Sequence, residues 1–168
     1  MEETISQVVL PKKRPTFITV LCILSLIGSG GFGLLQPLYQ YVTFEDSYPE
    51  KVAQIEEGLE QMEEAGMDSG FFYDMAANGR LALEKTAENL VPMTATNVLF
   101  ALLSLMGIFL MFKLKKNGFY LYTVVNLFWL LVPLYFIGIE MGMMTLLFGG
   151  IVTILFIVLY AVNLKHME

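Results

Sequence analysis

Four long apolar stretches dominate the pattern of hydrophobic and polar positions along the chain. They cover residues 16–42, 93–112, 119–138 and 143–164, and none of them contains a charged residue. A helix that crosses a bilayer needs about 20 mostly apolar residues, because the hydrocarbon core is about 30 Å thick and each residue rises about 1.5 Å. The pattern therefore predicts an all-α membrane protein with four transmembrane spans.

Short hydrophilic connections and one longer acidic insert separate these spans. Short connections make consecutive helices antiparallel neighbours, so we expect a four-span antiparallel helical bundle. Within the insert, apolar residues recur at helical spacing on both sides of a glycine-containing break, which predicts an extracytoplasmic helical hairpin between the first and second spans. The expected segments are a leader (1–15), the first span (16–42), the insert (43–92), the second span (93–112), a basic turn (113–118), the third span (119–138), an outer turn (139–142), the fourth span (143–164) and a C-terminal segment (165–168).

The two ends of the first span carry different signals. The apolar run is longer than that of a signal peptide and no Ala-x-Ala site follows it, so we interpret it as an uncleaved anchor. Ser47 and Glu50 match a capping box, which predicts that a separate helix begins there. Cys22 is the only cysteine of the chain, which excludes an internal disulfide.

The charges are divided unevenly between the insert and the rest of the chain. The insert holds twelve acidic and three basic residues, a net charge of −9, so the remaining segments carry +3 of the overall −6. Basic residues in short loops stay on the cytoplasmic side of a membrane, and here they predict an N-in/C-in orientation with the insert outside. The residues that determine this orientation are Lys12, Lys13, Arg14, Lys113, Lys115 and Lys116.

Small residues gather in the first and fourth spans. Residues 28–33 match the dinucleotide pattern Gly-x-Gly-x-x-Gly, but a pyrophosphate site needs a strand and a turn that an apolar span does not supply. We expect these residues to let helices approach closely, within the bundle or against a partner. A broken first span that lines a cavity is the alternative interpretation. The expected packing residues are Ser25, Ser29, Gly33, Gly142, Gly149 and Gly150.

Asn97 and Asn126 are the most polar residues predicted to lie within spans. An amide in hydrocarbon seeks a hydrogen-bonding partner, so we expect both to clamp helices together; a role in binding a substrate is the alternative. Ion-coupled transport generally leaves ionisable side chains in the membrane. The four spans contain none, which argues against an active transporter.

Catalytic and metal-binding patterns are missing from the sequence. His166 is the only histidine, so neither a zinc site of histidines nor a Ser-His-Asp triad can be assembled. Asp68-Ser69-Gly70 is a poor fragment of a calcium loop, and we expect the acidic insert to present a solvated face that binds, at most, a cation or a basic partner weakly. We expect no enzymatic activity, no cofactor and no nucleic-acid partner.

Two short motifs carry a resemblance to a known group. Arg14-Pro15-Thr16-Phe17 leads into the apolar Val20-Leu21-Cys22-Ile23-Leu24, and a basic turn, Lys113-Leu114-Lys115-Lys116-Asn117-Gly118, runs into Phe119-Tyr120-Leu121-Tyr122. In these segments the chain resembles small four-span membrane proteins of unknown function that are common in Bacteroidetes. The resemblance implies a bacterial inner (cell) membrane location and supplies no functional residues.

These patterns favour a non-enzymatic multi-pass membrane protein, an accessory or scaffold subunit of a larger membrane complex. The acidic insert would be its outer interaction surface. The expected partners are another membrane protein or a second copy of the chain, together with the lipid bilayer around the spans. The alternative is a passive pore or a carrier of lipid or a small solute, with a cavity near the first span, Asn97 and Asn126.

Overall fold

The computed structural model describes residues 15–168, and every regular element in that range is a helix. Four helical stretches are long and apolar enough to cross a membrane: Thr16–Glu64, Leu90–Phe112, Lys116–Phe136 and Ile139–Val162. The expected helical fold with four apolar helices of membrane length is thereby confirmed for the described residues. The elements are α1 (Thr16–Ile27), the π-helix η1 (Gly28–Leu35), α2 (Gln36–Glu64), α3 (Phe71–Glu88), α4 (Leu90–Phe112), α5 (Lys116–Trp129), α6 (Val132–Phe136), α7 (Ile139–Val162) and a short 3₁₀ turn, η2 (Leu164–His166).

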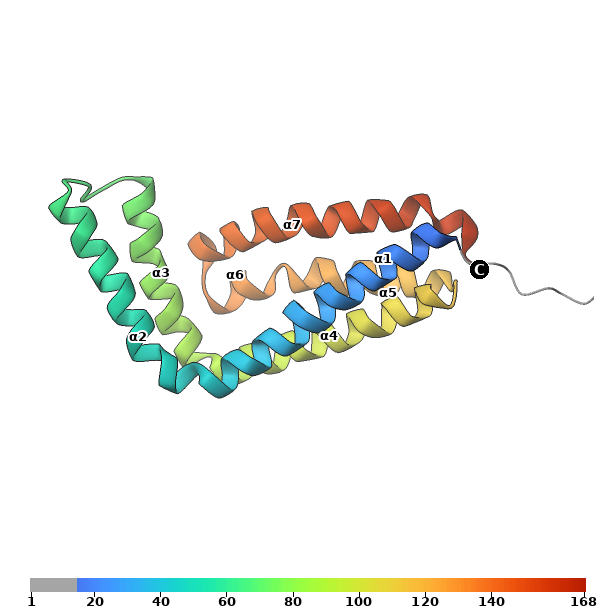
Figure 1. Ribbon diagram of the computed structural model, residues 1–168, viewed down its shortest axis with the longest axis horizontal. Helices are drawn as coiled ribbons and strands as arrows, with labels where there is room; N and C mark the ends of the chain where they lie inside the picture. The colour runs from blue at the N-terminus through green and yellow to red at the C-terminus, as the bar shows by residue number, and fades with distance from the viewer. Residues whose placement is uncertain (1–14) are drawn as a thin grey trace, which may run out of the picture.

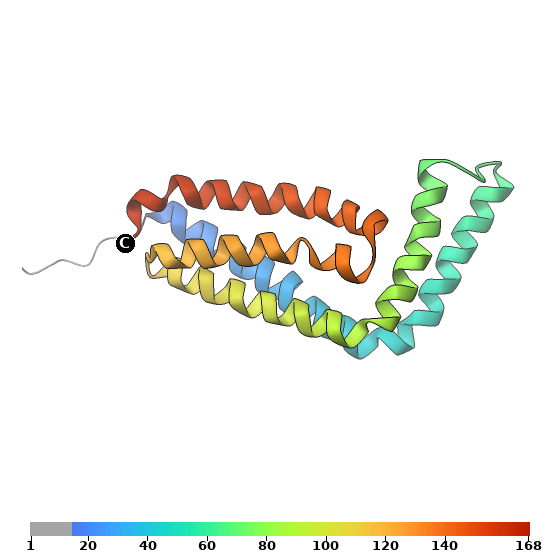
Figure 2. The same ribbon diagram turned by 180° about the vertical axis from the view of Figure 1, so that it is seen from behind.

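The molecule consists of a helical bundle and an arm that leaves one end of it. Figures 1 and 2 show α1, η1, α4, α5, α6 and α7 in the bundle, and α2 and α3 side by side in the arm. We call the end of the bundle next to the arm the arm end. The opposite end holds the connection between α4 and α5 and the chain's C-terminus, and we call it the turn end.

The first span and the arm form one continuous helical stretch of 49 residues. The capping-box prediction is wrong, because the Ser47 hydroxyl donates to the carbonyl of Phe44 at 3.3 Å and the helix passes through Pro49 without a new start. Proline has no N–H and its ring crowds the preceding turn, which bends a helix there. The chain bends between the span and the arm in Figure 1, and α2 runs without interruption through the boundary expected at residue 43.

The third and fourth spans also differ in detail from their expected limits. The third span is divided into α5 and α6 by a turn just before Pro133, whose missing N–H removes one hydrogen bond of the helix. The turn expected at 139–142 lies earlier, because α7 begins at Ile139, directly after Gly138. Gly138 has φ +111°, a conformation that residues with a Cβ rarely adopt, and it allows the chain to reverse there.

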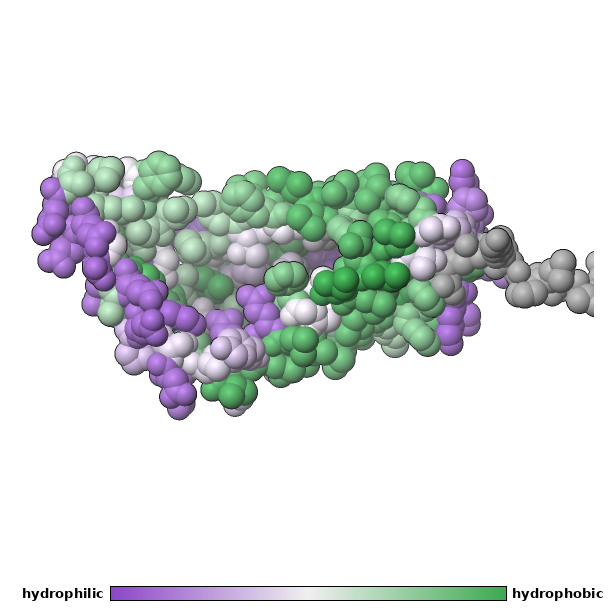
Figure 3. Space-filling model, in the orientation of Figure 1, coloured by the Kyte–Doolittle hydropathy of each residue, from purple (hydrophilic) through white to green (hydrophobic). Residues whose placement is uncertain are grey.

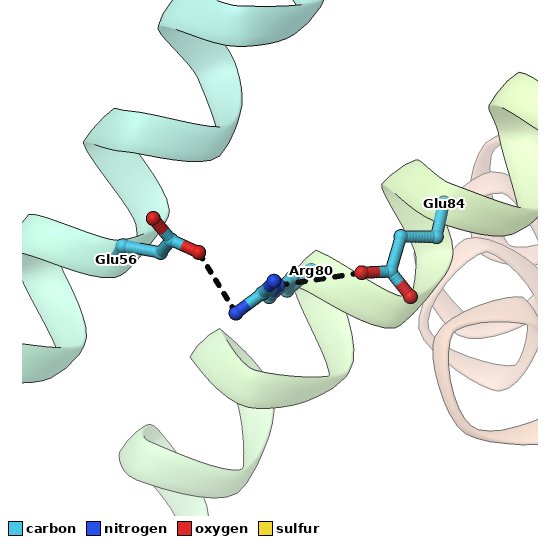
Figure 4. A network of polar contacts seen from close by, with 3 residues as sticks. All are labelled: Glu56, Arg80 and Glu84. Carbon is cyan, nitrogen blue, oxygen red and sulfur yellow. Dashed lines mark ion pairs between the residues drawn. The ribbon is translucent and has the colours of Figure 1, made fainter.

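Polar contacts join the two helices of the arm. Arg80 lies between two carboxylates, 2.8 Å from Glu56 of α2 and 3.3 Å from Glu84 of its own helix (Figure 4). These side chains are about half exposed, so each pair contributes at most about 1 kcal/mol. Near the tip, the Tyr73 hydroxyl donates to Glu63 at 2.7 Å, and this hydrogen bond and the carboxylate's charge raise the pKa of the Tyr73 phenol.

The closest helix packing in the bundle joins α4 and α5. A Cβ added at Gly118 would lie 2.5 Å from the backbone nitrogen of Met111 and 2.6 Å from the carbonyl oxygen of Gly107. The buried core lies beside this contact, at the turn end, and its fully buried side chains are Ile18, Cys22, Ile108, Met111, Tyr160 and Met167. Dense packing is therefore concentrated at the turn end of the bundle.

Substitution of Gly118 by alanine tests this contact. We expect Gly118→Ala to lower the free energy of unfolding by about 1–3 kcal/mol, because the new methyl group meets backbone atoms that cannot move independently. Gly58 of α2 is the matched control, since no atom lies within 4 Å of its added Cβ. Gly58→Ala should raise stability by about 0.5–1 kcal/mol. Equal effects of the two variants in a denaturant titration in micelles would contradict the packing described.

Candidate functional site

A cavity of about 490 Å³ lies in the middle of the bundle. Ligand sites in proteins commonly enclose about 300–1,000 Å³. Two sides of this cavity come from α1 and η1 and from α7, and α4 and α5 form its floor. Much of the lining is aromatic: Phe32, Phe100, Tyr122, Trp129, Phe148 and Phe156. Among the described residues, no Asp, Glu, Lys, Arg or His lines the cavity.

The cavity forms because the first span diverges from α7 toward the arm end. At the turn end α1 reaches α7, where the Tyr160 hydroxyl donates to Ser25 at 2.9 Å. Further along, η1 packs on α4, and a Cβ added at Gly33 would lie 3.3 Å from the Cβ of Ala101. Figures 1 and 2 show the same divergence of the ribbons. The cavity is therefore open at the side of the bundle, between η1 and α7.

The surface around this opening is apolar. In Figure 3 a band of hydrophobic residues covers the bundle between hydrophilic residues at the two ends, and a hollow with paler and hydrophilic residues interrupts the band. Large apolar side chains of the spans point outward, including Ile27 at 61%, Phe148 at 70% and Ile151 at 68% exposure. Such a band suits contact with lipid, and the hollow lies within it.

Glycines at 28, 30, 31 and 33 coincide with the π-helical part of the first span. A π-helical turn is wider than an α-helical one and occurs frequently at functional sites. Gly28 and Gly33 line the cavity, as does Ser29 between them. The glycine-rich segment that resembles a nucleotide motif is thus an irregular helical turn at the cavity wall.

Three polar contacts in the cavity wall join different helices. The hydroxyls of Ser29 and Ser104 lie 3.0 Å apart, and Asn126 donates through Nδ2 to the same Ser104 oxygen at 3.1 Å and to the carbonyl of Tyr122 at 2.8 Å. Trp129 donates through Nε1 to Oδ1 of Asn97 at 3.0 Å. Both asparagines therefore link α4 to α5, and both also line the cavity.

Four polar groups that line the cavity have no hydrogen-bond partner among the described residues. They are Nδ2 of Asn97, Oδ1 of Asn126, the hydroxyl of Thr153 and the amide of Gln36. A polar group in hydrocarbon without a partner costs free energy, so these groups favour an occupant that forms hydrogen bonds.

The remaining residues expected at packing sites lie near this cavity or at the arm end. Gly149 lines the cavity, and a Cβ added there would lie 3.5 Å from the side chain of Leu130. A Cβ added at Gly150 would lie 4.0 Å from the same side chain. Gly142 meets α6, where an added Cβ would lie 2.8 Å from the Cα of Leu134. Lys113 and Lys115 lie in the connection between α4 and α5, and Lys116 begins α5. The basic residues at 12–14 lie outside the described residues.

Sequence reasoning missed several residues that form the site or support it. Ser104 lies seven residues after Asn97 and therefore on the same face of α4. This spacing of two polar residues in an apolar stretch could have identified Ser104 from the sequence. Gln36 lies within the apolar stretch 16–42, and its local sequence does not mark it as a site residue. Gly107 and Gly118 are isolated glycines, and nothing in their local sequence reveals that they face each other.

Comparison of the chain with protein-family models, with curated proteins and with solved structures found no match.

A double-mutant cycle on Tyr160 and Ser25 tests the contact that closes the cavity at the turn end. We expect Tyr160→Phe and Ser25→Ala each to lower stability, with a coupling energy of about 0.6–1.7 kcal/mol, the range of hydrogen bonds between membrane helices. Tyr120→Phe is the control, because Tyr120 is 58% exposed and should be additive with Ser25→Ala. Additivity in the Tyr160 cycle, measured by denaturant unfolding in micelles, would contradict the contact.

Proposed function

We propose that this protein is a non-enzymatic carrier that binds an amphipathic molecule inside the bilayer. The cavity carries this proposal, because it combines an apolar aromatic lining with a few hydrogen-bonding groups, as ligand sites commonly do. The buried core fills the bundle at the turn end, which favours a carrier over a continuous pore. The sequence alone favoured an accessory subunit, with a carrier or pore as the alternative. We place the carrier first because of this cavity.

The proposal includes the setting of the protein in the membrane. The four apolar helices form an antiparallel bundle in a bacterial inner membrane, with both ends of the chain in the cytoplasm and the α2–α3 arm as an extracytoplasmic helical hairpin. Lys113, Lys115 and Lys116 at the turn end and the acidic charge of the arm support this orientation.

Transbilayer movement of a fluorescent lipid tests the carrier proposal. In proteoliposomes containing an NBD-labelled hexosylceramide, which is uncharged and crosses membranes slowly, we expect the protein to accelerate the loss of fluorescence after dithionite reduces the accessible label. Gly149→Leu should slow this movement toward the rate of empty liposomes, because a leucine there fills the cavity. Gly30→Leu is the matched control, since Gly30 lies outside the lining and has no atom within 4 Å of its added Cβ.

Wild-type protein that leaves the rate of empty liposomes unchanged would overturn the carrier proposal. An equal loss of movement in Gly149→Leu and Gly30→Leu would count against the cavity as the route.

A second candidate function is that of an accessory or scaffold subunit, and the tip of the arm favours it. Met67, Phe71, Phe72 and Met75 form an apolar tip patch, and the first three are 53%, 65% and 66% exposed. Exposed apolar clusters of this kind are typical of protein interaction sites. The acidic residues of α2 and α3 surround the patch with negative charge, so the fitting partner is a membrane protein with a basic, partly apolar outer surface.

Photocrosslinking from the tip tests the accessory role. A benzoylphenylalanine in place of Phe72 should form one discrete adduct in native membranes, because the tip patch would lie against the partner. The same probe in place of Glu60, an exposed residue of α2, is the control and should form none. Adducts that are missing at Phe72, or equal at both positions, would contradict the accessory role.

A further inference from the structure

We infer that the cavity binds the polar head of an uncharged, hydroxyl-bearing lipid of the diacylglycerol type. This inference rests on the proposed carrier function and specifies its ligand. Three observations carry it: the absence of charge in the lining, the two levels at which unpaired polar groups lie, and the sideways opening of the cavity.

The lining excludes an ionised headgroup. Moving a phosphate or an ammonium group out of water costs several kcal/mol unless an opposite charge compensates for it. No charged side chain in the described part of the chain, residues 15–168, lines the cavity. An uncharged head can be held by hydrogen bonds alone, and amide and hydroxyl groups are what this wall provides.

The unpaired groups lie at two levels along the bundle. Ser29 lies against Ser104 and Gly33 against Ala101, and the continuation of this register places Gln36 at the level of Asn97. These two amides form a polar mouth toward the arm end. Deeper, Asn126 lies at the level of Ser104. Ser104 and Asn97 are seven residues apart, which is about 10 Å along a helix.

The unpaired groups call for a ligand that both donates and accepts hydrogen bonds. Nδ2 of Asn97 donates, Oδ1 of Asn126 accepts, and the amide of Gln36 and the hydroxyl of Thr153 do both. A diacylglycerol carries a hydroxyl that donates and accepts, together with ester carbonyls that accept. Its glycerol unit therefore fits the polar mouth and the groups below it.

The sideways opening identifies a lipid rather than a water-soluble polyol as the source of this chemistry. The opening lies within the apolar band of the bundle (Figure 3), which acyl chains would surround when the four membrane-length helices span a bilayer. A cavity of about 490 Å³ holds the head of a diacylglycerol but not its chains. The chains would leave between η1 and α7 and remain in the bilayer.

Fluorescence of the single tryptophan tests the inference directly, because Trp129 is a wall residue of the cavity. The protein is reconstituted in phosphatidylcholine nanodiscs, and its emission is measured with increasing mole fractions of diacylglycerol that carries dibromostearoyl chains. Phosphatidic acid and phosphatidylcholine with the same brominated chains provide the charged and the bulk references. We expect saturable quenching by the brominated diacylglycerol at mole fractions where the two references quench only weakly.

A variant at the polar mouth separates recognition of the head from general contact with lipid. Gln36→Leu removes an exposed amide that bonds no described residue, so folding should be unaffected. It should lower the apparent affinity for diacylglycerol about three- to tenfold, the loss expected for one hydrogen bond in a membrane. Gln40→Leu, one turn further along α2 and outside the lining, should leave the affinity unchanged.

The outcomes separate a failure of the ligand assignment from a failure of the proposed carrier function. Equal saturable quenching by all three lipids, unaffected by Gln36→Leu, would overturn the assignment of an uncharged hydroxylated lipid and leave a lipid-binding cavity. Quenching that rises linearly for all three lipids would overturn the cavity as a binding site, and the carrier proposal with it. Relief of the quenching by free glycerol would shift the assignment to a soluble polyol and overturn the lipid.

Discussion

Hydrocarbon offers no hydrogen bonds, and this constraint decides where the polar side chains of the four spans lie. Each internal amide or hydroxyl needs a partner on another helix, on its own backbone or in a bound molecule. Ser25 forms a hydrogen bond with Tyr160, and Ser29 forms one with Ser104. Asn97 and Asn126 are paired through only one of their two polar atoms, and the other atoms remain at the cavity. The cavity is thus one place where the bundle leaves its hydrogen bonds incomplete, and the buried hydroxyl of Thr123, outside the lining, is another.

The distribution of packing follows from the same helices. At the turn end, glycines at 107 and 118 allow close contact of α4 and α5, and the buried core lies beside them. Toward the arm end, the π-helical segment of the first span stays on α4 while α7 lies apart. A bundle that is dense at one end and open in the middle combines stability with space for a ligand. The irregular first span is central to that division.

The class of the protein was predictable because it depends on local composition alone. Runs of about 20 apolar residues specify membrane helices whatever their neighbours are. The asparagines at 97 and 126 were also identifiable, since an amide stands out in an apolar run. Pairings were not predictable in the same way: that Ser29 meets Ser104, or Gly107 meets Gly118, depends on the register between helices far apart in sequence. The capping-box prediction failed because α2 is continuous through Pro49, so that Ser47 lies inside the helix and not at its start.

A structure of the protein in phosphatidylcholine nanodiscs containing diacylglycerol, at a resolution that shows side chains, would test the central claim most directly. The account predicts that η1 and α7 stay apart in the bilayer and that density for one lipid head lies against Asn97 and Gln36, with chains leaving between the two helices. A bundle in which α7 closes onto η1, with Asn97 and Asn126 fully paired to protein groups and no space between them, would contradict it.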